Sequence, residues 1–284
     1  MNPLLRTCIV TGLMDGSVVP YLGPGILADV VSTTTGEAIP ATSDQLIIAL
    51  NGGKPMSPKL MYEFPRAAMN IELKRGRTAI TRFLNTTYGE TAWSRSALHD
   101  WLQTIRPPYV IDINRDTQLI DSYAGVPHLL ILGCARITGN AYRFNLYTSD
   151  GAHYTAISPD QADTRLPILF KPMGAPIPEP SYIASDADYV DFITELMGGF
   201  AVPSFVKMYR PEKRYLLLGM RLNRDTERMV FSDLIYSAAS PAGWALIENP
   251  TDKERRFLGK IGIELIQASL QDLIAESMAE ALPS

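Results

Sequence analysis

Short runs of apolar and β-branched residues occur along the whole chain, and helical patterns separate most of them. Runs of this length that end in turn-forming residues are typical of buried strands. Strands that alternate with helices favour a parallel sheet covered by helices on both faces. The sequence therefore predicts an α/β fold with a Rossmann-like, doubly wound, mainly parallel sheet. The expected strands are Ser17–Leu22, Tyr109–Ile111, His128–Leu132, Leu166–Phe170, Arg214–Met220, Trp244–Ile247 and Ile263–Ile266.

The first two expected strands are separated by a long segment in which apolar residues recur at helical spacing, for example Met61, Phe64 and Ala67. This spacing predicts a helical insertion at about residues 50–105, within a single domain that spans residues 1–284. Two further pieces complete the expected order of elements. They are a β-rich piece at 142–157, with hairpin turns at 139–140 and 150–151, and a final amphipathic helix at 269–282.

Two of the expected strands end in residues that suit a ligand site. Gly23-Pro24-Gly25 follows the first strand and precedes an apolar, helix-like start at 26–31, which is the layout of a nucleotide-phosphate loop. The same residues also suit an ordinary turn, and Pro24 has no N–H group to offer a phosphate. Asp112-Ile113-Asn114-Arg115-Asp116 follows the second strand, where open α/β sheets bind their ligands. Its Asn and Asp side chains are equally suited to capping the next helix.

Composition and charge exclude several classes of function. The 284 residues carry a net charge of −4, so bulk charge attracts neither nucleic acid nor an anionic membrane. The two cysteines, Cys8 and Cys134, are too few for a four-cysteine zinc site and fit a reducing compartment. No His has metal-ligand spacing to either cysteine, so no metal is expected. No signal peptide and no apolar run of about 18 residues is present, which predicts a cytoplasmic protein.

Taken together, these motifs resemble the bacterial Sir2-like, sirtuin-related domain, over about residues 15–275. The family's GAGxS phosphate loop, TxNxD motif, strand ending in K-L-H-G, DY segment and G-Y-S-L-x-D motif occur in this order. The corresponding segments are 23–27, 112–116, 171–174, 188–189 and 219–225. The resemblance implies nucleotide contacts from Gly23, Gly25, Asn114, Asp116 and Gly219. It also implies that the Asn orients the attacking water or the nicotinamide ribose and that the Asp holds the nicotinamide amide.

The chain departs from this family at its reactive positions. The family's catalytic His corresponds to Met173, whose thioether cannot accept a proton. In the phosphate loop, Pro24 replaces Ala and Leu27 replaces Ser, which removes one N–H and one hydroxyl. Asp112 replaces the family's Thr and would repel a pyrophosphate that it faced. Asn114, Asp116 and Met173 are therefore expected to be vestigial catalytic positions. None of His99, His128 and His153 is expected to replace the missing base.

Two functions follow from this combination. The first is a pseudoenzyme that needs no cofactor and binds a protein partner as an accessory or regulatory factor. The rigid, Pro-rich segment Lys171–Pro180 is expected to be exposed and to suit such a partner. The resemblance to short Sir2-like proteins encoded near nitrogen-fixation genes implies a nitrogenase component as the candidate partner. The second is a binding sensor for NAD or ADP-ribose, or a weak NAD glycohydrolase. Deacylation is disfavoured, because the cysteines of the usual zinc module are absent.

Overall fold

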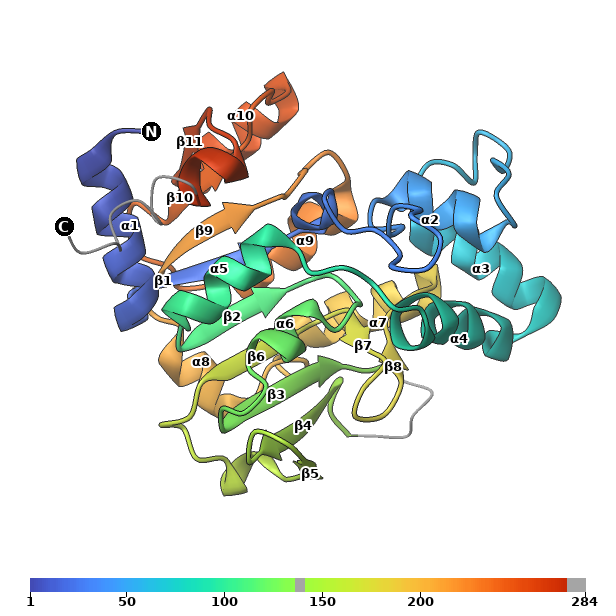
Figure 1. Ribbon diagram of the computed structural model, residues 1–284, viewed down its shortest axis with the longest axis horizontal. Coiled ribbons are helices and arrows are strands. Elements are labelled where there is room, and N and C mark those ends of the chain that lie inside the picture. The colour runs from blue at the N-terminus through green and yellow to red at the C-terminus, as the bar shows by residue number, and fades with distance from the viewer. Residues whose placement is uncertain (136–140, 275–284) are drawn as a thin grey trace.

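A nine-stranded sheet forms the centre of the protein (Figure 1), as described by a computed structural model for residues 1–135 and 141–274. The strand order is β11-β10-β9-β1-β2-β6-β3-β4-β5. Every neighbouring pair from β11 to β3 is parallel, and β4 and β5 extend the sheet as antiparallel strands. The strands are β1 (Val18–Leu22), β2 (Tyr109–Asp112), β3 (His128–Gly133), β4 (Phe144–Ser149), β5 (Tyr154–Ala156), β6 (Ile168–Lys171), β9 (Arg214–Leu218), β10 (Gly243–Leu246) and β11 (Ile263–Ile266). A separate two-residue hairpin pairs β7 (Gly174–Ala175) with β8 (Ser181–Tyr182).

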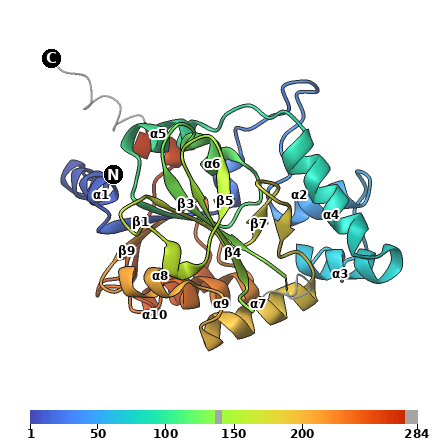
Figure 2. The same cartoon turned by 90° about the horizontal axis from the view of Figure 1, so that it is seen from below.

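Helices cover both faces of this sheet (Figure 2). One face carries α1 (Pro3–Asp15), α5 (Ala97–Ile105) and α6 (Gln118–Ser122), and the other carries α7 (Asp186–Gly198), α8 (Ser204–Tyr209), α9 (Asp225–Leu234) and α10 (Asp252–Lys260). Because successive side chains of a strand point to opposite faces, β1 contributes to two separate cores. Val18 and Leu22 pack in the core under α1 and α5, whereas Val19 and Tyr21 pack in the core under α7–α10. The predicted Rossmann-like α/β architecture is therefore confirmed.

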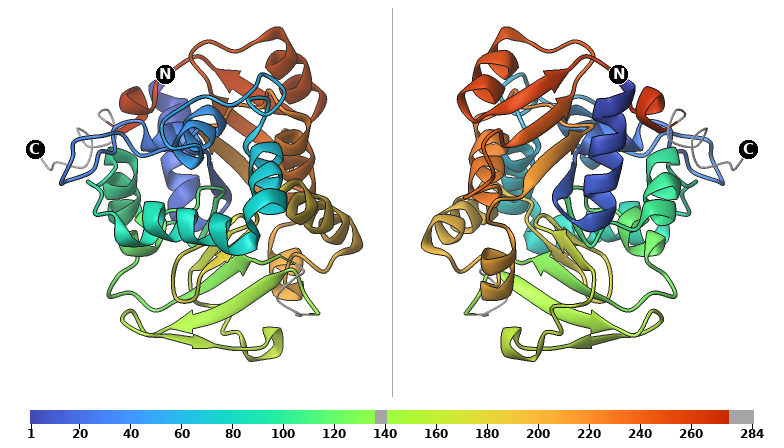
Figure 3. Two further views of the ribbon diagram at one scale, coloured as in Figure 1. Left: turned by 90° about the vertical axis from the view of Figure 1, so that its right-hand side faces the viewer. Right: turned by 90° about the vertical axis from the view of Figure 1, so that its left-hand side faces the viewer.

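The segment between β1 and β2 lies beside the edge at which the parallel strands end (Figure 3, left). It forms η1 (Pro24–Leu27), α2 (Ser43–Leu50), α3 (Phe64–Arg75), α4 (Arg77–Asn85) and a π-helical turn, η2 (Thr86–Glu90), before α5. Glycine separates α3 from α4, because Gly76 has φ +80° and ends the first helix. This helical region stands over the carboxyl ends of β1, β2 and β6, which places it next to the loops that carry the motifs.

Three local expectations were wrong or incomplete. The apolar residues after Gly25 form only the short η1 instead of a full helix. No helix was expected for residues 3–15. The structure has α1 there, capped by the Asn2 side chain and ended by Gly16 at φ 77°. The final helix is seen at 270–274, and its remainder and the turn at 139–140 lie outside the described residues.

The Pro-rich segment was expected to be exposed, and this expectation was wrong for most of it. Residues 171–176 are buried, and only Glu179 and Pro180 are exposed within 171–180. The cause is the β7–β8 hairpin, which folds the segment back onto the sheet, so that Ile183 donates its N–H to the Met173 carbonyl at 3.1 Å. Most of this segment is therefore part of the buried core, and little of it is available to a protein partner. Among the described residues, no helix combines the length and apolar character that crossing a membrane requires.

Candidate functional site

A pocket of about 740 Å³, including its open mouth, lies where β1, β2 and β6 end. The sheet side contributes Tyr21, Asn114 and Met173, and the helical region contributes residues such as Leu46 and Phe64. β1 has β2 on one side and β9 on the other, and the chain crosses β1 to build the second half of the sheet. Ligands of open α/β sheets bind outside the carboxyl ends of the strands at such a crossing point. We call this the first pocket.

A buried ion pair lies at this edge of the sheet, at the ends of β2 and β6. The Asp112 carboxylate and the Lys171 ammonium are 2.5 Å apart, and both side chains are 0% exposed. Burial raises the pKa of the Asp112 carboxyl to about 6, although Lys171 opposes this shift. Asp112 does not line the first pocket, and its charge is matched by Lys171. The sequence analysis, which considered Asp112 alone, did not anticipate this pairing.

Asn114 connects this ion pair to the loop after β1. Its side-chain amide donates to the Asp112 carboxylate at 2.9 Å and to the Gly23 carbonyl at 3.1 Å. Its backbone N–H also donates to Asp112, at 2.9 Å. Asn114 lines the first pocket, and no hydrogen bond from the described residues reaches its side-chain oxygen. A ligand with an N–H or O–H group could use this oxygen, whose position is fixed by the two bonds of the amide nitrogen.

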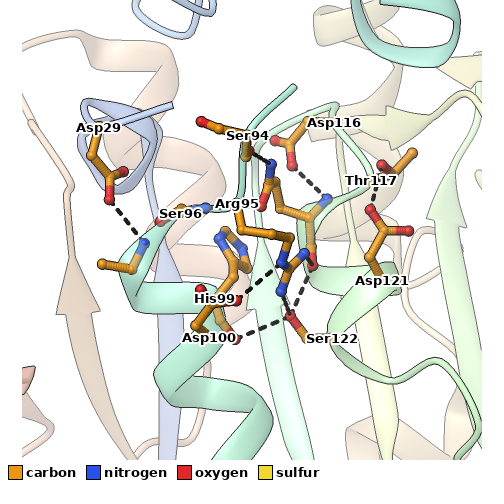
Figure 4. A network of polar contacts seen from close by, with 12 residues as sticks. Asp29, Ser94, Arg95, Ser96, His99, Asp100, Asp116, Thr117, Asp121 and Ser122 are labelled. Atoms are coloured by element: carbon orange, nitrogen blue, oxygen red, sulfur yellow. Dashed lines mark hydrogen bonds and ion pairs between the residues drawn. The ribbon is translucent and has the colours of Figure 1, made fainter. Parts of the chain in front are cut away.

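Asp116 lies in a different polar network, which joins α5 to α6 (Figure 4). Its Oδ1 accepts the Gln118 N–H at 2.8 Å, which satisfies the first amide of α6 from just outside the helix, since Thr117 is the N-cap residue. Gln118 in turn accepts the Ser96 N–H at 3.1 Å, and Arg95 donates to the Gln118 carbonyl at 2.9 Å. Asp116 does not line the first pocket. Asp116 thus supports the start of α6 through Oδ1, whereas its buried Oδ2 has no hydrogen-bond partner among the described residues.

The three glycines expected to contact a nucleotide contact the protein's own backbone. The Gly25 N–H donates to the Gly219 carbonyl at 2.8 Å, and the Gly23 N–H donates to the Leu218 carbonyl at 2.9 Å. A Cβ on Gly25 would lie 2.9 Å from the Gly219 carbonyl oxygen. The glycines therefore allow the loops after β1 and β9 to touch. With Pro24 lacking an N–H, the start of this loop has no free amide for a phosphate.

Replacing Gly219 with Ala is expected to destabilise the fold through this contact. Gly219 has φ +65°, and its Cβ would lie 2.4 Å from the Ile26 nitrogen. Gly36 is a matched control, because it has φ +74° and no atom within 4 Å of its Cβ position. We expect Gly219→Ala to cost about 2 kcal/mol more than Gly36→Ala in urea-induced unfolding. Equal losses would show that the close approach of the two loops does not matter.

Met173 and Leu27 occupy the two positions at which the resembled family has His and Ser. Met173 is 3% exposed and lines the first pocket, so the position of the expected base is apolar. Leu27 is buried in the core under α1 and α5 and lies outside the pocket. None of the three histidines lines the pocket. His99 is fully buried, and burial holds its pKa well below 6.5.

The sequence analysis missed Arg115 as a pocket residue, although it quoted the motif that contains it. Arg115 is buried and is held by the Ile183 carbonyl, at 3.1 Å from Nε and 2.6 Å from Nη2. Nη2 also donates to the Tyr189 hydroxyl at 3.3 Å, and the guanidinium lies 5.3 Å from the centre of the Phe64 ring. Tyr189 belongs to the expected DY segment and also lines the pocket.

A second group missed by the sequence analysis comes from the start of α9. Arg224, Thr226 and Glu227 line the first pocket together with Glu63, which precedes α3. The Thr226 hydroxyl donates to Glu63 at 3.0 Å, and the Arg224 N–H donates to Glu227 at 3.2 Å. Burial raises the pKa of Glu227 to about 7, and the Glu63 charge adds to this shift. Only the helix-start pattern of these residues was visible in the sequence.

A second pocket of about 590 Å³ lies on the other side of the Gly25–Gly219 contact. Gly25 and Gly219 themselves line it, as do Arg221, Glu248 and Asn249. It opens at the carboxyl ends of β9, β10 and β11, whereas the first pocket serves β1, β2 and β6. The two pockets are therefore neighbours along one edge of the sheet, and the loop 23–25 separates them.

The family of this chain is identified neither by family models nor by comparison with curated proteins. No protein-family model matches it, and a search of curated proteins finds no match. Within residues 1–135 and 141–274, no group of three His, Cys, Asp or Glu side chains could hold a metal ion. Cys8 is exposed and Cys134 is buried, and neither forms a disulfide. The function therefore has to be inferred from the pockets themselves.

Proposed function

We propose that this protein is a Sir2-like binding protein that lacks the family's base and senses a nucleotide of the NAD or ADP-ribose class. The observation that supports this best is the pair of neighbouring pockets along the carboxyl edge of the sheet. A dinucleotide is long and has polar groups at both ends, so it suits two pockets that share one loop. The first pocket has the mixture of apolar walls and few fixed polar groups that small-molecule sites show.

Hydrolysis of the ligand is a weaker proposal than binding. Removing a proton from water needs a basic group within hydrogen-bond reach of it. Met173 supplies none at the position of the family's base, and Lys171 is bound to Asp112 inside the sheet. The two carboxylates of the pocket, Glu63 and Glu227, accept hydrogen bonds from Thr226 and from the Arg224 N–H on the α9 side. Binding requires only shape, hydrogen bonds and charge, all of which the first pocket offers. A sensor is therefore better supported than a glycohydrolase.

Thermal unfolding with and without ADP-ribose or NAD tests the binding role. A ligand present at 100 times its dissociation constant adds about 2.7 kcal/mol to the stability of the folded state. We expect an upward shift of Tm with ADP-ribose at millimolar concentration, with its affinity then measured by calorimetry. Incubation with NAD is expected to release no nicotinamide. No shift with either ligand would contradict the binding role, and release of nicotinamide would show an enzyme.

A protein-binding accessory role is the second candidate, and one surface favours it. Val190 and Met197 are exposed and lie seven residues apart on α7, which puts them on one side of that helix. The exposed Phe200 follows α7, and its carbonyl accepts the N–H of Arg143, next to the exposed Tyr142. A partner such as a nitrogenase component would have to cover this surface. This role alone predicts that neither ADP-ribose nor NAD raises Tm.

A further inference from the structure

Arg224 stands out in the first pocket because its guanidinium is held by an aromatic ring and not by a hydrogen-bonded carboxylate. Its guanidinium lies 4.4 Å from the centre of the Tyr62 ring. Within the part of the chain that the structure describes, no hydrogen bond or ion pair is formed by this guanidinium. Stacking on a ring leaves the N–H groups at the edge of the guanidinium free to bind an anion. The side chain is half-buried and lines the pocket, so these donors are within reach of a ligand.

The backbone of the loop after β1 cannot take this role. The N–H groups of Gly23 and Gly25 are bound to the loop after β9, and Pro24 has none. A phosphate group at this edge therefore finds no amide cradle in the loop after β1. Its charge is then left to other groups of the pocket, of which the arginine side chains carry the positive charge.

Arg115 provides a second cation that lines the first pocket. Two of its three nitrogens are bound to the Ile183 carbonyl, which fixes the plane of the guanidinium. Among the described residues, Nη1 has no hydrogen-bond partner. A guanidinium held in place in this way loses little conformational freedom when it binds a ligand.

The carboxylates of Glu63 and Glu227 on the α9 side narrow the class of ligand. The Glu63 carboxylate, together with Glu227 once it has lost its proton, disfavours a bare inorganic anion beside Arg224. Carboxylates accept hydrogen bonds from sugar hydroxyls, as the acidic residue of dinucleotide-binding folds does with ribose. The first pocket thus combines donors for a phosphate with acceptors for a diol.

We propose that Arg224, assisted by Arg115, binds the phosphate of a ribosyl-phosphate ligand in the first pocket, in place of the loop after β1. This inference rests on the proposed function and assigns the group that recognises the ligand. Glu63 and Glu227 then select for a sugar attached to the phosphate. Arg224 is a binding residue here and takes no part in a reaction.

Calorimetry with ADP-ribose on three variants tests this assignment. Arg224→Gln is expected to weaken binding about 10- to 100-fold, because it removes hydrogen bonds to a charged group. Arg224→Lys keeps the charge but loses the paired geometry, and it is expected to be intermediate. Arg66→Gln is the matched control, since Arg66 lies 5.2 Å from the same Tyr62 ring but is exposed and does not line the pocket. It is expected to bind like the wild type.

The outcomes separate this inference from the function on which it rests. If the wild-type protein does not bind ADP-ribose, the proposed function fails. If the wild type binds but Arg224→Gln binds equally well, only the assignment of Arg224 fails. If Arg66→Gln weakens binding as much as Arg224→Gln, the stack on Tyr62 matters instead of the phosphate contact, and the assignment is again overturned.

Discussion

Replacing Lys171 with Met is expected to destabilise the folded protein by about 3–5 kcal/mol at pH 8. Lys171 and Asp112 are both 0% exposed and lie 2.5 Å apart. Without the ammonium, Asp112 remains as an unpaired charge inside the sheet. Urea-induced unfolding measures this loss. We expect a smaller loss at pH 5, because Asp112, whose pKa is already about 6, can then become neutral by binding a proton.

A double substitution distinguishes a lost pair from lost packing. Asp112→Asn combined with Lys171→Met leaves no buried charge, and it is expected to recover part of the stability lost by Lys171→Met alone. The Asn side chain keeps an oxygen that can accept the two hydrogen bonds from Asn114. Arg165→Met is the surface control, because Arg165 pairs with Asp163 in solvent and should leave the unfolding midpoint unchanged. Additive losses in the double variant would contradict this account.

The ion pair also shows which part of the site could be predicted from sequence. The strands that carry Asp112 and Lys171 were predicted, because short apolar runs between turn residues are a strong local signal. Their pairing was not, since β6 follows β3 in the chain but lies between β2 and β3 in the sheet. The register that brings Ile111 opposite Phe170 is a property of the folded sheet alone.

The pocket-lining residues were less predictable than the strands. Asn114 and Met173 were found because they follow strands directly, and the carboxyl ends of parallel strands meet at one edge. Glu63 and Arg224 are more than 150 residues apart, and only the folded chain, in which the Thr226 hydroxyl donates to Glu63, brings them to one pocket. The glycines show the opposite error. Their spacing suggested a phosphate loop, whereas in the fold they allow two loops to touch.

Replacing Glu227 with Gln is expected to flatten the dependence of stability on pH between about 4.5 and 7. In the folded state burial raises the pKa of Glu227 to about 7 from 4.5, so within this range the folded protein holds a proton that the unfolded chain has released. The stabilisation that comes from this bound proton is fully present below pH 4.5 and is lost as the pH rises through 7. At pH 8, Glu227→Gln is therefore expected to be more stable than the wild type by on the order of 2–3 kcal/mol.

The charged groups around Glu227 set the pH at which it loses its proton in the folded state. Glu63 raises the pKa of Glu227, and Arg224 and Arg228 lower it. Glu63→Gln should therefore keep the pH dependence but move its upper end to lower pH. Tyr21 and Tyr189 also lie near Glu227, but burial raises the pKa of both hydroxyls, so they stay neutral in this range. Urea-induced unfolding at several pH values measures how the free energy of unfolding depends on pH in the wild type, in Glu227→Gln and in Glu63→Gln. Parallel curves for the wild type and Glu227→Gln would show that Glu227 does not titrate in the pocket.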